Sequence, residues 1–222
     1  MTVSTDSDAA AEAAAPVDDT TPGHRGRGWL LVAAALTVGA LLGLGIGLIA
    51  PRLSAPGDDS VEAGFLRDMS THHAQAVEMS MIAHADSTDP EIVNLAGDIA
   101  LTQHGQIGYM QAWLRDWDLS PTSSQEPMAW IPGSAGSVVN GLMPGMATPE
   151  QLADLREATG KDLDVQYLTL MRQHHLGGIH MAQEAIRLSD NKDVDWLAGT
   201  MVTAQQGEIT LIDNLLKKIQ AS

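Results

Sequence analysis

An internal repeat is the feature of this sequence that most constrains its fold. Residues 65–114 align with residues 167–216 without a gap. A match that keeps one register over so long a stretch indicates a duplicated structural unit. Identical residues occupy equivalent positions in the two copies: Leu66, Met69, His72, His73, Met79 and Ala83 correspond to Leu168, Met171, His174, His175, Met181 and Ala185. Each copy has the apolar period of two helices, so we expect two helical hairpins that close into a four-helix bundle.

Capping signals place the ends of these helices. The run Asp58-Asp59-Ser60 precedes one apolar-periodic stretch and Asp89, followed by Pro90, precedes the next, and both are typical of a helix N-terminus. Thr148 and Gln151 form a capping-box pattern that predicts a short helix, closed at about residue 160. The expected long helices span about residues 58–85, 89–117, 162–188 and 193–220.

The predicted domain organisation follows from these helices. The hairpin repeats cover residues 60–117 and 162–220, and the proline- and glycine-rich residues 118–161 form an irregular connection between them. Strand signals are nearly absent. We therefore predict an all-α fold, with residues 58–222 as one helical-bundle domain.

The N-terminal segment has the composition of a membrane-spanning helix that follows a disordered arm. Residues 1–28 are rich in Ala, Thr and Asp and lack an apolar period, which indicates disorder. Residues 29–50 are uncharged and long enough to cross a hydrocarbon core of about 30 Å. Arg25 and Arg27 precede this span and only Arg52 follows it closely, so the positive-inside rule places the arm in the cytoplasm and the bundle outside.

A cleaved signal peptide is the alternative, and it would make the protein secreted. The apolar region of a signal peptide is about 7 to 15 residues long, so we predict that residues 29–50 are instead an uncleaved, single-pass anchor in the cytoplasmic membrane. Gly39, Gly43 and Gly47 have the spacing of a helix-pairing face, so a homodimer is a further option.

The composition excludes several classes of function. The formal net charge of −16 argues against nucleic-acid binding, because little in the chain could neutralise phosphates. The chain has no cysteine, so disulfides and thiolate metal sites are ruled out. It has 11 methionines and 8 histidines, so soft metal ligation would have to use thioether and imidazole groups.

The repeated cluster of Met and His is the candidate metal site. In each copy the first Met and the two adjacent His lie within one helical turn, close enough to share an ion, and the second Met lies farther along the same face. His84 continues that line and would extend it into a ladder of sites. Two methionines in the connection are additional candidates. The predicted ligand set is Met69, His72, His73, Met79, Met143, Met146, Met171, His174, His175, His180 and Met181.

Polar residues interrupt the apolar face of the second helix in both copies. Gln103 and Gln106 occupy this face in the first copy, and Gln205 and Glu208 occupy the same positions in the second. Buried polar groups need hydrogen-bond partners. We therefore expect both pairs to support the histidines.

Copper suits this ligand set best. Thioethers favour Cu(I) and imidazoles favour Cu(II), whereas zinc gains little from methionine and is the weaker alternative. A di-iron site needs repeated Glu-x-x-His patterns that this chain lacks. We expect metal binding for sequestration, buffering or handover to a copper-handling partner protein. A metal-dependent oxidase and a non-catalytic adaptor, in which Met and His only pack the core, are the competing hypotheses.

The residues around these clusters resemble the bacterial domain-of-unknown-function 305 family. The resemblance rests on residues 69–79, which begin Met-Ser-Thr-His-His, on Gly145 and Met146, and on residues 170–182, and it extends over about residues 60–220. It implies a ferritin-like helical fold and an extracytoplasmic location. Some members of that family are associated with copper binding. The two copies also differ here, because Glu208 and Ile212 replace Gln106 and Met110, so the two halves need not bind alike.

Overall fold

The computed structural model describes residues 25–53, 55–134 and 136–221, and the chain divides into two units, 1–53 and 54–222. In the first unit, α1 (Arg25–Leu53) contains the apolar stretch Gly28–Gly47, with a mean hydropathy of 2.3. This helix is long and apolar enough to cross a membrane, although a signal sequence near the N-terminus would have the same character. Most of the predicted arm, residues 1–24, lies outside the described residues.

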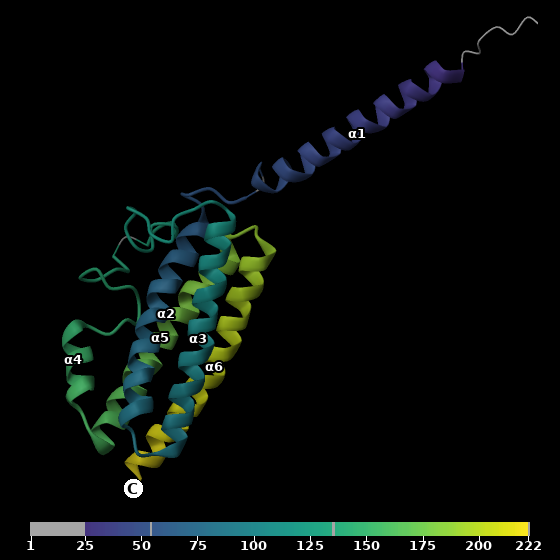
Figure 1. The fold of residues 1–222 in the computed structure, drawn as a ribbon. Coiled ribbons are helices and arrows are strands. Elements are labelled where there is room, and N and C mark those ends of the chain that lie inside the picture. The colour runs from purple at the N-terminus through teal and green to yellow at the C-terminus, as the bar shows by residue number, and fades with distance from the viewer. Residues whose placement is uncertain (1–24, 54, 135, 222) are drawn as a thin grey trace, which may run out of the picture. The chain divides into compact units, whose positions relative to one another are not determined.

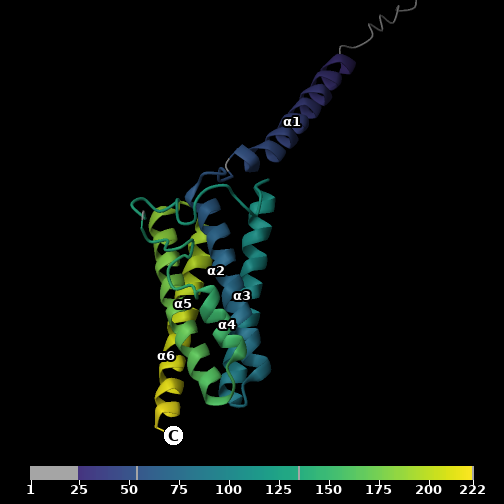
Figure 2. The ribbon, with the colours of Figure 1, turned by 90° about the vertical axis from the view of Figure 1, so that its left-hand side faces the viewer.

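The second unit is all-α and contains the predicted four-helix bundle (Figures 1 and 2). Its long helices are α2 (Val61–Asp86), α3 (Pro90–Asp116), α5 (Gly160–Leu188) and α6 (Lys192–Gln220), and α4 (Pro149–Glu157) is a short helix in the connection. No strand occurs in residues 55–134 and 136–221, where the nearest feature is one isolated bridge between Val139 and Leu142.

The expected capping residues begin three of these helices. The Ser60 hydroxyl accepts a hydrogen bond from the backbone N–H of Ala63, and the Asp89 carboxylate accepts one from Glu91. Thr148 and Gln151 exchange side-chain and backbone hydrogen bonds in a complete capping box. Each cap satisfies backbone donors that the first helical turn leaves unpaired.

The two hairpins meet mainly through their first helices. α2 packs against α3 and α5 packs against α6, while α2 and α5 form the principal contact between the hairpins. The short helix α4 packs on the outer side of α2 and α5, as Figure 2 shows. The first helix of each copy carries the Met and His cluster, so this arrangement brings both clusters to the centre of the bundle.

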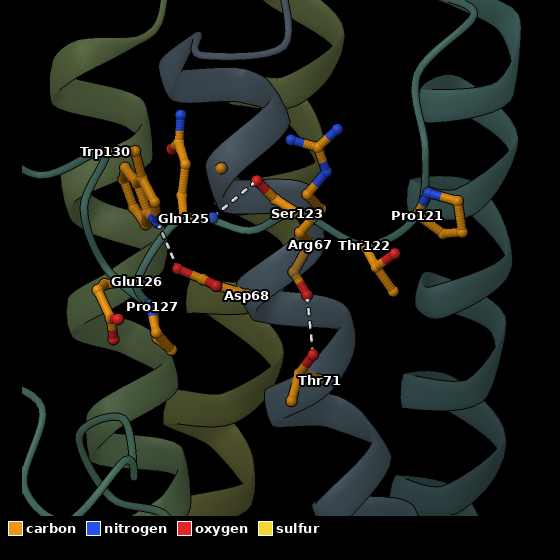
Figure 3. Close-up of a pocket in the computed structure, with 11 residues that line it drawn as sticks. Arg67, Asp68, Thr71, Pro121, Thr122, Ser123, Gln125, Glu126, Pro127 and Trp130 are labelled. Carbon is orange, nitrogen blue, oxygen red and sulfur yellow. Dashed lines mark hydrogen bonds between the residues drawn. The ribbon is translucent and has the colours of Figure 1, made fainter.

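The connection between the hairpins is fixed to the first turns of α2. The Asp68 carboxylate accepts hydrogen bonds from the Met128 backbone N–H (2.6 Å) and from the Trp130 indole (2.8 Å), beside the pocket in Figure 3. The Trp130 ring packs edge-on against Phe65, at 5.7 Å between ring centroids. Gly64 leaves room for this indole, because a Cβ there would lie 2.6 Å from Trp130. These contacts turn an irregular segment into part of the core.

Candidate metal centre

Four histidines form one buried layer where α2 crosses α5. The side chains of His72, His73 and His175 are fully buried, and His174 is 1% exposed. The rings of His72 and His174, which are equivalent residues of the two copies, lie 3.7 Å apart between centroids at an interplanar angle of 38°. The structure therefore joins the repeated motifs at one place in the bundle and does not leave one separate site in each hairpin.

Every histidine of this layer donates its Nε2–H to an oxygen. His72 Nε2 lies 3.0 Å from the Pro144 carbonyl, and His174 Nε2 lies 2.9 Å from the carbonyl of His72. His73 Nε2 lies 2.8 Å from Gln106 Oε1, and His175 Nε2 lies 2.6 Å from Glu208 Oε2. Carbonyl and carboxylate oxygens only accept hydrogen bonds, so each Nε2 carries a hydrogen, and in a neutral imidazole the Nδ1 then carries a lone pair.

The four Nδ1 atoms are buried and have no hydrogen-bond partner within the described ranges of the bundle. Gln103 and Gln205 lie in the core nearby, and Gln103 Oε1 and Nε2 and Gln205 Oε1 are likewise buried and unpaired among the described residues. A buried polar atom without a partner costs about 1–3 kcal/mol. Lone pairs on neutral imidazoles, each oriented by an acceptor at the opposite nitrogen, are the donors that protein metal sites use. The layer therefore fits a metal ion chemically.

Burial keeps three of these imidazoles, those of His72, His73 and His174, neutral. It lowers the pKa of His72 to about 4, and burial together with the neighbouring His72 lowers the pKa of His73 to about 3. Burial and the adjacent histidines hold the pKa of His174 well below its usual value. Only the neutral form of histidine binds metal, so these three residues stay available as ligands in mildly acidic solution.

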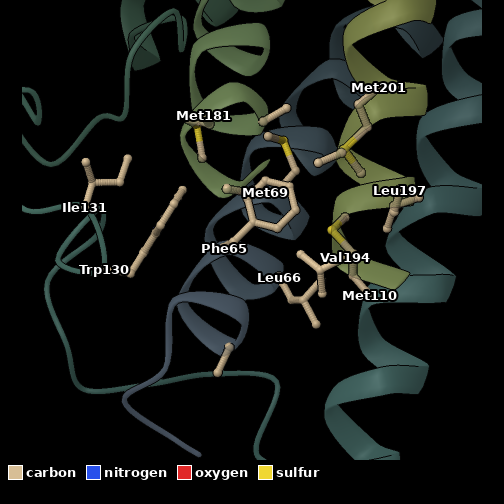
Figure 4. Packing of buried hydrophobic residues seen from close by; sticks show 14 of the residues in the cluster. Phe65, Leu66, Met69, Met110, Trp130, Ile131, Met181, Val194, Leu197 and Met201 are labelled. Carbon is tan, nitrogen blue, oxygen red and sulfur yellow. The ribbon is translucent and has the colours of Figure 1, made fainter. Parts of the chain in front are cut away.

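Methionine side chains flank the histidine layer on both sides. Met69 of α2 and Met181 of α5 belong to one core cluster, shown in Figure 4, and Met79 and Met171 belong to the other. All four are fully buried. Among the described residues, no three His, Cys, Asp or Glu side chains gather at one point that could hold an ion. An ion at this layer would therefore be held by few imidazoles, with thioethers to complete its coordination.

The other predicted ligands differ in how deeply they are buried. Met143 is buried in the same cluster as Met69, and Met146 is half-buried against it. His180 lies on the exposed surface of α5, so the structure does not bring it to the buried histidines. The predicted extension of the ladder to His84 is wrong, because that side chain is exposed and its Nδ1 bonds the Val93 carbonyl at 2.9 Å.

The expected support from α3 and α6 is present in part, since Gln103 Oε1 and Nε2 and Gln205 Oε1 have no hydrogen-bond partner among the described residues. The sequence did not reveal the role of the connection. Gln106 and Glu208 accept from His73 and His175, as predicted. The Pro144 carbonyl, which accepts from His72, was missed because backbone acceptors leave no trace in residue type. One signal was available, since Gly177 and Gly178 in the second copy stand where the first copy has Gln75 and Ala76.

Gly177 permits the connection to reach His72. A Cβ on Gly177 would lie 1.9 Å from the Pro144 carbonyl oxygen. We expect Gly177→Ala to lower the free energy of unfolding by about 1–3 kcal/mol, as overpacking against backbone does. In the matched variant Gly207→Ala, where nothing lies within 4 Å of the new methyl group, we expect a gain of up to about 1 kcal/mol from helix propensity. Urea denaturation measures both, and equal effects would contradict the close packing.

Comparison with solved structures gives relatives of the same fold. A DUF305 protein from Streptomyces coelicolor is 43% identical, with a TM-score of 0.69, and the match covers 74% of this chain and 96% of that one. A DUF305 fragment from Deinococcus radiodurans is 27% identical, with a TM-score of 0.60 and coverage of 71% and 96%. CopM in its Cu(II)-bound form is 23% identical, with a TM-score of 0.57 and coverage of 72% and 97%, and CopM was also solved in Cu(I)- and Ag-bound forms.

No curated protein matches this chain. The family described as "Domain of unknown function (DUF305)" matches residues 62–216, from the second residue of α2 to the last turns of α6. That range includes both hairpins, the connection and all four buried histidines. The chain therefore belongs to the DUF305 family.

Proposed function

We propose that this protein binds copper in the centre of its bundle and serves to sequester, buffer or hand over the ion. The observation that carries the proposal is the set of four buried imidazoles whose Nδ1 atoms have no hydrogen-bond partner among the described residues. A polar layer that only stabilised the core would pair its atoms. The relative CopM, which has the same fold, was crystallised with copper and with silver.

The proposed ligands are drawn from the four histidines, with no more than two imidazoles on any one ion, and from the four flanking methionines. Imidazole nitrogen suits both oxidation states of copper, and thioether sulfur favours Cu(I). The buried methionines of both core clusters would supply thioethers to an ion at the layer, namely Met69, Met79, Met171 and Met181. Met143 and Met146 are additional candidates at the connection.

Titration of the purified, metal-free full-length protein tests this function. We expect Cu(I) and its surrogate Ag(I) to bind in competition with a chelator. We also expect the side-chain ¹⁵Nδ1 NMR signals of the four buried histidines to shift, while those of the exposed His84 and His180 stay in place. No binding of either ion, or shifts confined to the exposed histidines, would refute the proposal.

We further propose that α1 stays attached and anchors the bundle outside the cytoplasmic membrane. The support is the apolar stretch Gly28–Gly47, which is longer than the apolar core of a signal peptide. Protein isolated from its own membranes should then keep the full mass of 23.5 kDa and need detergent for extraction. A soluble product that has lost the N-terminal residues would show that the segment is a cleaved signal.

A further inference from the structure

The two copies of the repeat give their second histidine different partners. His73 donates to the amide oxygen of Gln106 at 2.8 Å, whereas His175 donates to the carboxylate of Glu208 at 2.6 Å. Gln106 and Glu208 occupy equivalent positions of the repeat. The two hydrogen bonds therefore have the same arrangement, but one acceptor is a neutral amide and the other is a carboxylate. The Glu208 side chain is 19% exposed and lies against a fully buried imidazole.

Other residues around the two positions differ between the copies as well. Four residues farther along each helix, the first copy has the buried thioether of Met110 and the second has the buried aliphatic side chain of Ile212. The second copy also places the buried phenol of Tyr167, which bonds Ser80 at 3.1 Å, where the first copy has Phe65. Sulfur is balanced between the copies, because the buried Met201 of the second stands where the first has Ile99. The second half therefore differs by its carboxylate and its added phenol oxygen, not by its number of thioethers.

A carboxylate behind a ligating imidazole changes which ion the imidazole prefers. It raises the basicity of the opposite nitrogen and orients the ring. It also brings a negative charge into a region of low dielectric constant, where charge interactions are stronger than in water. A divalent ion gains more from that charge than a monovalent ion does. An amide at the same position orients the ring but adds no charge.

We propose that Glu208 is a positioning residue that biases the His175 half of the site toward Cu(II), whereas Gln106 leaves the His73 half suited to Cu(I). The inference rests on the proposed copper binding and deepens it, because it assigns an oxidation-state preference to each half. The duplication would then let one buried histidine layer accommodate either oxidation state of the ion.

Reciprocal substitutions in the full-length protein test this assignment, because each copy can be given the residue that the other copy has at the equivalent position. Glu208→Gln gives His175 an amide partner like the one that His73 has in Gln106. We expect it to weaken Cu(II) binding by about 10- to 100-fold, the usual effect of losing such a partner, while Ag(I) affinity changes less than about threefold. The reduction potential of the bound Cu(II)/Cu(I) couple should then rise by about 60–120 mV. A tenfold change in the ratio of the two affinities corresponds to about 59 mV for one electron.

The other arm of the experiment uses Gln106→Glu, which should strengthen Cu(II) binding and lower the potential. Glu78→Gln is the matched control, because it removes one negative charge from a carboxylate that is 42% exposed and paired with Arg156. Histidine ¹⁵N signals of the metal-free Glu208→Gln protein should still show Nε2–H on His175.

Two results would overturn the assignment. Equal loss of Cu(II) and Ag(I) affinity in Glu208→Gln would mean that Glu208 only supports the fold, and unchanged affinities in both reciprocal variants would mean that it does not tune the ion. Failure of the wild-type protein to bind either ion is a separate result, which would reject the proposed copper binding itself.

Discussion

Replacement of both paired histidines in His72→Leu/His174→Leu is expected to reduce Ag(I) and Cu(I) affinity by at least about a hundredfold. The pair contributes two of the four unpaired Nδ1 atoms, and its rings lie 3.7 Å apart between centroids. Loss of a group that only orients a metal ligand already costs about 10- to 100-fold, and this variant removes the ligands themselves. Chelator competition with the full-length protein measures the change.

The fold should survive this double substitution. Leucine is close to histidine in volume, and replacing buried, unpaired polar atoms by apolar groups of similar shape is often close to neutral. Metal should raise the melting temperature of the wild type, because an ion at a hundred times its Kd adds about 2.7 kcal/mol, and the variant should lose most of this gain. His84→Leu/His180→Leu is the matched control, with exposed histidines on the same two helices. Equal affinities for the two double variants would contradict a site at the buried layer.

Mild acid is expected to destabilise the metal-free bundle steeply. The pKa values of His72 and His73 in the folded protein are about 4 and about 3, and that of His174 is also well below normal, because all three are buried. In the unfolded chain their pKa values return to about 6.5. Between these values the unfolded state binds more protons, so stability is complete above about pH 6.5 and is lost as the pH falls toward the folded pKa values.

The slope of this loss identifies its source. Each of the three histidines contributes about 1.4 kcal/mol per pH unit within the window, and together they contribute about 4 kcal/mol per unit. A domain of ordinary stability, about 5–15 kcal/mol, would therefore approach its acid midpoint within a few units of neutrality. Urea denaturation at pH 7.5, 6.0 and 5.0 measures the slope. The His72→Leu/His174→Leu variant should show about a third of it, and an unchanged slope there would place the acid sensitivity elsewhere.

Much of the fold could be predicted from local signals. Ser60, Asp89 and Thr148 begin helices where expected, because a cap depends on a few neighbouring residues. The ungapped repeat predicted the two hairpins because both copies keep the same apolar face. α5 begins at Gly160 and α6 at Lys192, within two residues of the expected starts.

The candidate site could be predicted only in part. Periodicity placed His72 and His174 on inward faces, but it gives no information about how the hairpins rotate against each other, so the contact between the two rings was not foreseeable. The same limit explains His84, which lies on the helical line of the cluster but has an exposed side chain that bonds the Val93 carbonyl of α3. The role of Pro144 depends on a loop conformation and on the missing side chain of Gly177.

The hydrogen bond between His72 and Pro144 links the histidine layer to the connection between the hairpins. A cation bound at Nδ1 withdraws charge from the imidazole ring and makes its Nε2–H a stronger donor, so an ion at His72 would tighten the bond to the Pro144 carbonyl. Linkage makes this effect reciprocal. A protein that binds residues 143–146 and moves them away from α5 would therefore lower the affinity of the layer for the ion. Exchange of metal with a partner would then begin at a loop that acts through the backbone carbonyl of Pro144.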